Sequence, residues 1–84
     1  MDQILDLITL WYRDVLLYKS TIDTKHLIFK EDLYDIKDQA TMCSYIGLDN
    51  IFAAVDTARE RLAANVNFEL TIELLILAIK ENSR

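Results

Sequence analysis

The sequence predicts an all-α fold, a compact bundle of four to five helices that forms a single domain over residues 1–84. The first observation is that the chain has no proline and one glycine, the residue types that most often interrupt helices. The second is that apolar residues make up 52% of the chain and recur at helical spacing. The third is the length, because 84 residues allow one small hydrophobic core and leave no room for a second domain.

The first helix is expected over residues 2–19. Its apolar residues recur at intervals of four and three and share a stripe that is predicted to face the core: Ile4, Ile8, Trp11, Val15 and Tyr18. Beyond a polar edge, Leu10 and Leu17 form a second, narrower apolar strip. Because one core does not cover both strips, the second strip is predicted to contact a partner protein or a neighbouring helix.

A polar loop over residues 20–26 precedes a second helix, expected over residues 30–43. The narrow apolar face of this helix consists of Phe29, Leu33, Ile36, Ala40 and Cys43. A turn is predicted near residues 44–47, because the sole glycine, Gly47, lies there. The third helix is expected over residues 48–64, with an apolar stripe of Leu48, Ile51, Val55, Ala58 and Leu62.

Two asparagines mark the corner before the fourth helix, which is expected over residues 68–82. Asn65 tolerates the left-handed conformation that ends a helix, and Asn67 is suited to accept hydrogen bonds from the free amides of the next. The fourth helix is apolar around nearly its whole circumference, with one thin polar line of Glu69, Glu73 and Lys80. It is therefore predicted to lie at the centre of the bundle and to be the most buried helix.

The charge balance argues against direct contact with nucleic acid or with a membrane surface. Fourteen Asp and Glu residues outnumber nine Lys and Arg residues, the net charge is -5, and no basic run is present to neutralise phosphates. No apolar run approaches the ~20 residues that span a bilayer. The lone Cys43 has no disulfide partner in the chain, which indicates a reducing cytoplasm.

No catalytic, cofactor-binding or metal-binding residue is predicted. One glycine is too few for a phosphate-binding loop, and Cys43 with His26 does not make a zinc site. His26 is interpreted as a solvated loop residue, and the carboxylates on the outer helix faces as solubilising groups. The predicted functional residues form a protein interface instead: Leu10, Arg13, Asp14 and Leu17. Arg13 and Asp14 also fit a simple solvated ion pair.

Two segments carry a resemblance to a known family: LWYRDVLLYK at residues 10–19 and NVNFELTIELLI at residues 65–76. Together with the pattern between them, they resemble the C-terminal domain of bacterial DNA polymerase III delta-prime subunits, which belong to the clamp loader. The resemblance covers nearly the whole chain. The collar domains of gamma and tau subunits are similar in the last part and form the near alternative, and an unrelated helical adaptor is the alternative from a different class.

The resemblance implies a helical collar domain that has no enzymatic activity and acts in cytoplasmic DNA replication. Such a domain packs against the collar domains of the gamma/tau and delta subunits and holds together the ring that loads the sliding clamp. DNA binding and nucleotidyl transfer belong to the parent DNA polymerase III complex.

The resemblance also predicts that the chain is part of a longer subunit. Full-length family members carry an ATPase-like module and a zinc-binding segment before the collar, and neither motif occurs here. The chain is therefore expected to be a C-terminal fragment. Family collars have an additional helix upstream, and its absence would itself expose Leu10 and Leu17.

Overall fold

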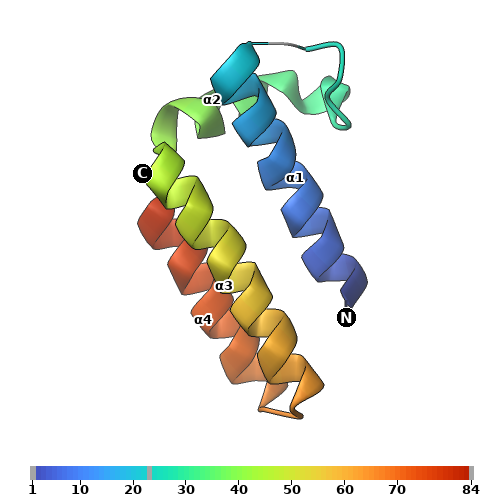
Figure 1. Cartoon of the computed structure of the whole chain (residues 1–84), viewed down its shortest axis with the longest axis vertical. Coiled ribbons are helices and arrows are strands. Elements are labelled where there is room, and N and C mark those ends of the chain that lie inside the picture. Colours follow the sequence, from blue (N-terminus) through green and yellow to red (C-terminus); the bar gives the residue numbers. More distant parts are fainter. Residues whose placement is uncertain (1, 23, 84) are drawn as a thin grey trace.

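The computed structural model describes residues 2–22 and 24–83, which form four α-helices and one short 3-10 helix, η1, without any strand. The elements are α1 (Asp2–Thr21), η1 (Lys30–Asp32), α2 (Leu33–Met42), α3 (Tyr45–Ala63) and α4 (Phe68–Asn82). The prediction of an all-α bundle is confirmed (Figure 1). Two boundaries inside the chain differ from the expected ones. The second predicted helix divides into η1 and α2, and α3 begins earlier than expected, at Tyr45.

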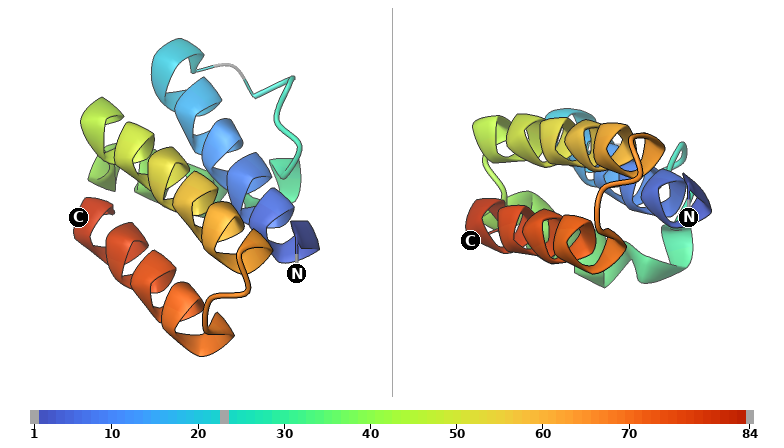
Figure 2. Two further views of the ribbon diagram at one scale, coloured as in Figure 1. Left: turned by 60° about the horizontal axis from the view of Figure 1, so that its bottom comes forward. Right: turned by 90° about the horizontal axis from the view of Figure 1, so that it is seen from below.

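The helices form two layers (Figure 2). One layer contains α1 and α3, and the other contains α2 and α4. Packing follows the order α2, α1, α3, α4, so that α1 and α3 each have two helical neighbours and the other two helices lie at the edges. The long helices α3 and α4 run antiparallel, side by side.

Two clusters of buried side chains make up the core. The first lies where α1, α2 and the start of α3 meet, and its buried members are Tyr12, Val15, Leu27, Ile36, Ala40, Cys43, Leu48 and Ile51. The second lies between α1, α3 and α4, and its buried members are Leu5, Val55, Ala58 and Leu75. The apolar faces predicted for the second and third helices are therefore confirmed, and buried Cys43 is a free thiol.

The core-facing side of α1 is rotated from the predicted stripe. Leu5 and Val15 are fully buried and Tyr12 nearly so, whereas Ile4 is exposed and Trp11 is only partly buried. The reason is that α3 packs against the flank that carries Leu5 and Tyr12, since Leu5 shares the second core cluster with Val55 and Tyr12 shares the first with Leu48.

The prediction that the fourth helix is central and most buried is wrong. The only buried residues of α4 are Thr71 and Leu75. Its exposed apolar residues are Phe68, Leu70, Leu74, Ile76 and Leu77. A helix that is apolar all round gives no indication of which face meets the core, and α4 lies at the edge of the bundle against α3.

The turn before α3 also differs from the expectation built on Gly47. Gly47 lies inside α3, and the chain turns at the extended residues Cys43 and Ser44. Ser44 is the N-cap, and its Oγ accepts the Gly47 N–H at 2.9 Å. At the other corner the predictions are confirmed, since Asn65 has a left-handed φ of 59° and Asn67 Oδ1 accepts the Leu70 N–H at 2.9 Å.

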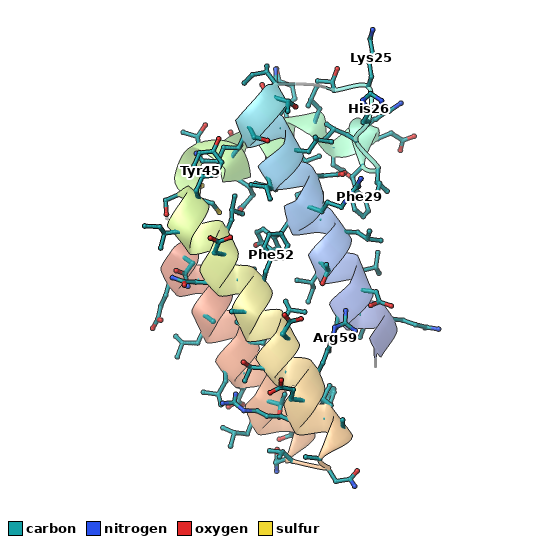
Figure 3. All side chains as sticks on the ribbon, viewed as in Figure 1. Lys25, His26, Phe29, Tyr45, Phe52 and Arg59 are labelled. Atoms are coloured by element: carbon teal, nitrogen blue, oxygen red, sulfur yellow. The ribbon has the colours of Figure 1, made fainter. Side chains whose placement is uncertain are left out.

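Polar contacts connect the helices at both ends of the bundle. Lys19 Nζ donates to the Ala40 carbonyl at 2.8 Å and lies 5.1 Å from the centre of the Tyr45 ring, which ties α1, α2 and α3 together. Near the other end, Arg59 of α3 forms an ion pair with Asp6 of α1 at 2.6 Å (Figure 3). Phe52 packs between these ends against the first core cluster.

Candidate protein-interaction surface

An apolar groove lies along the N-terminal half of α1. Its lining residues come from three separate parts of the chain: Leu7, Ile8, Trp11 and Tyr12 of α1, Phe29 before η1, and Ile79 of α4. The groove has a volume of about 350 Å³. Figure 3 shows Phe29 beside α1 on the side away from α3. Because every lining residue is apolar or aromatic, the groove is suited to apolar side chains of another protein.

Exposed apolar side chains extend the surface beyond the groove. Leu7 is 55% exposed and Leu10, one helical turn further along α1, is 37% exposed. Ile4 is also exposed, one turn before Leu7, and Ile76 is exposed one turn before Ile79 on α4. We call the groove residues together with Ile4, Leu10 and Ile76 the α1 apolar surface. Contiguous apolar surface of this kind marks interaction sites in soluble proteins.

Phe29 forms one wall of the groove, and two residues of α1 contact it. The rings of Trp11 and Phe29 lie 5.5 Å apart at an interplanar angle of 56°, a tilted arrangement that aromatic pairs favour. The Phe29 N–H donates to Asp14 Oδ2 at 2.7 Å. Asp14 is fully buried, and its Oδ1 has no hydrogen-bond partner among the described residues. The Arg13 Nη1 atom lies 3.8 Å from that oxygen.

The four residues that the sequence assigned to an interface lie in different environments. Leu10 and Arg13 are on the surface, and Leu10 belongs to the α1 apolar surface. Leu17 is partly buried and packs against the first core cluster, so the prediction that it stands away from the core is wrong. Asp14 is inside the domain, which excludes the interpretation of Arg13 and Asp14 as a solvated pair.

Tyr12 is the groove residue whose hydroxyl has a shifted pKa. It is 8% exposed, and burial raises the pKa of its hydroxyl above the ordinary value of 10.0, because the charged form loses its hydration. The phenol therefore stays neutral at physiological pH. Over the residues that the structure describes, no group of three or more His, Cys, Asp or Glu side chains is arranged to hold a metal ion.

The sequence analysis assigned none of the six groove residues to the interface. It placed Ile8, Trp11 and Phe29 on core-facing stripes, and it placed the fourth helix, which carries Ile79, at the centre of the bundle. One signal was available in the sequence: the apolar part of the first helix is wider than a single helical neighbour covers. Which flank stays uncovered depends on how the helices pack, and local spacing does not contain that information.

A small all-α domain that leaves an apolar groove and much of an edge helix uncovered is typical of a module that binds other proteins. The model of the family described as DNA polymerase III, delta subunit, C terminal matches residues 1–81, and the chain belongs to this family. It is thus a domain of a DNA polymerase III clamp-loader subunit, which acts in DNA replication. Comparisons with curated proteins and with solved structures found no significant match. Among the described residues, no helix is both long and apolar enough to cross a membrane.

Proposed function

We propose that this chain is the collar domain of a delta-prime clamp-loader subunit and that it joins the loader ring through the α1 apolar surface. The collar domains of the gamma/tau and delta subunits are its partners, and the domain itself carries out no catalysis. The observation that carries the proposal is the uncovered groove in a domain whose family belongs to a multi-subunit assembly.

The surface chemistry supports a protein partner. The groove residues are apolar or aromatic, and aromatic residues such as Trp11 and Phe29 are typical of the energetically dominant part of protein interfaces. The net charge of -5 disfavours phosphate backbones as the ligand. We therefore assign DNA contact to other parts of the loader and place the domain in the cytoplasm, as a single unit over residues 1–84 at the C-terminal end of a longer subunit.

The test uses the full-length subunit that carries this domain, with Leu7 replaced by Asp. Leu7 is more than half exposed, so Leu7→Asp should leave the melting temperature almost unchanged. A charge in an apolar interface should weaken binding to the other loader subunits by tenfold or more, measured by gel filtration and calorimetry. Tyr34→Asp on α2 is the matched control, since Tyr34 is 86% exposed and does not line the groove.

Three outcomes would contradict the proposal. Assembly of the Leu7→Asp subunit at wild-type affinity would exclude the groove as the binding site. ATP binding by the full-length wild-type subunit, measured by calorimetry, would favour a gamma/tau collar over a delta-prime collar. If the subunit assembled only with proteins that are not loader subunits, the domain would be a helical adaptor.

A further inference from the structure

The connection between α1 and η1 is fixed near its end by two residues of one helix turn. Leu27 is buried in the first core cluster, and two residues later Phe29 reaches α1. Trp11 and Asp14 lie three residues apart on α1 and therefore on the same side of the helix. Trp11 contacts the Phe29 ring and Asp14 accepts the Phe29 N–H, so that the side chain and the backbone of Phe29 are held by separate contacts.

Stabilising the fold does not by itself account for Asp14, because burying its carboxylate is unfavourable for the free energy of folding. Its carboxylate is fully buried, yet among the residues that the structure describes only Oδ2 has a hydrogen-bond donor, and the Arg13 guanidinium is beyond hydrogen-bond distance from Oδ1. A buried carboxylate without a complete set of partners loses more hydration free energy than one hydrogen bond returns. What the contact does supply is a fixed position for Phe29, whose amide sits 2.7 Å from Oδ2.

That position matters because Phe29 forms a wall of the groove and is also the N-cap residue of η1. Its carbonyl accepts the Asp32 N–H at 3.0 Å, so that η1 follows directly on the residue that Asp14 holds. If Phe29 moved away from Trp11, the groove would lose the wall that Phe29 forms. A groove that is already shaped before binding spares the partner the entropy cost of ordering it.

We infer that Asp14 is a positioning residue for the α1 apolar surface: it holds Phe29 against Trp11 and keeps the groove formed before a partner arrives. The inference rests on the proposed function, in which that surface binds neighbouring loader subunits. Asp14 does not touch the partner. It acts through Phe29, which explains how a buried acid influences binding at a surface.

The experiment compares Asp14→Asn with Asp14→Leu in the full-length subunit. Asparagine keeps an acceptor oxygen of the same reach and removes the charge, whereas leucine keeps the branched shape with larger methyl groups and removes the acceptor. In Asp14→Leu the Phe29 amide should lose its protection from hydrogen exchange while amides of α3 such as that of Ile51 keep theirs. Binding to the other loader subunits should weaken about tenfold. Asp14→Asn should keep both the protection and the affinity within about threefold.

A control separates positioning from general loss of stability. Val55→Ala removes buried volume from the second core cluster and lowers stability without replacing a residue that lines the groove. Its affinity for the loader subunits should stay at the wild-type value even when its melting temperature falls as far as that of Asp14→Leu. A parallel fall in affinity would overturn the inference, because stability alone would then control binding.

The remaining outcomes distinguish the inference from the proposed function. If Leu7→Asp weakens assembly and Asp14→Leu does not, the groove binds partners but Asp14 does not position it. If Leu7→Asp has no effect, the proposed function fails first. Should Asp14→Leu not fold, the wild-type subunit still provides a test without a partner: a Phe29 amide that exchanges as fast as a fully unprotected amide would overturn the inference.

Discussion

Gly47 shows that the need for glycine can come from the approach of another helix instead of from a turn. Its backbone is helical, with no positive φ. A Cβ atom added there would lie 2.7 Å from the carbonyl oxygen of Asn82 and 3.1 Å from Ser44 Oγ. The first of these atoms belongs to the backbone at the end of α4, which does not move aside without shifting the helix. Gly47 therefore permits the close contact between the start of α3 and the end of α4.

This geometry predicts that Gly47→Ala destabilises the domain although alanine favours helices. Overpacking against a backbone atom costs about 1–3 kcal/mol, and the helix preference of alanine returns about 1 kcal/mol. We expect a net loss, measured as a lower midpoint in urea unfolding. Ala53→Gly is the control, because Ala53 is an exposed position of α3. There glycine itself should cost about 1 kcal/mol. Stabilisation by Gly47→Ala would show that α4 does not approach α3 this closely.

Residues with local roles were predictable from the sequence, and residues with tertiary roles were not. Asn65 and Asn67 act within a few residues of their own positions. An asparagine was therefore enough to predict the helix end at Asn65 and the N-cap at Asn67. Asp14 accepts a hydrogen bond from an amide fifteen residues away. Gly47, in α3, lies against the carbonyl of Asn82 at the end of α4. Their residue types are compatible with several other roles, so only the packed structure identifies the contact.

At the scale of elements, helical spacing located all the helices and the inner faces of α2 and α3. It failed for α4 because a spacing argument needs a polar face to oppose the apolar one. The packed structure shows Leu75 buried and Leu77 exposed on the same helix. The apolar residues of α4 therefore divide into those that hold α4 on α3 and those that face outward.

This division predicts a large difference between two equivalent substitutions. Leu75 is 3% exposed and belongs to the second core cluster, so Leu75→Asp places a carboxylate among Leu5, Val55 and Ala58 without a partner. The cost should be several kcal/mol, comparable with the whole stability of a small domain. Leu77 is 51% exposed, and Leu77→Asp should change stability by less than about 0.5 kcal/mol. Circular dichroism melts of both variants provide the measurement, and similar melts would show that α4 is not packed through Leu75.

At the scale of the whole molecule, the domain has more apolar surface than its own helices cover. The exposed residues of the α1 apolar surface are Ile4, Leu7 and Leu10 on α1 and Ile76 on α4, and none of them belongs to either core cluster. Folding and assembly are therefore expected to depend on different side chains of the same helix. Leu10 and Leu17 test this expectation, because the sequence placed them on one strip and the structure separates them by burial.

We predict that Leu10→Ser and Leu17→Ser in the full-length subunit affect different properties. Leu10 lies outside both core clusters, so Leu10→Ser should leave the melting temperature nearly unchanged and weaken assembly about tenfold, since a lost apolar contact in a packed interface costs ~1–2 kcal/mol. Leu17 packs against the first core cluster, so Leu17→Ser should cost ~1–3 kcal/mol of stability. For a domain of this size that loss corresponds to about 4–8 °C per kcal/mol in melting temperature. Calorimetric melts and titrations with the other loader subunits measure the two effects. Equal losses of melting temperature in both variants, with assembly intact, would place Leu10 against an additional helix of the same subunit and remove it from the interface.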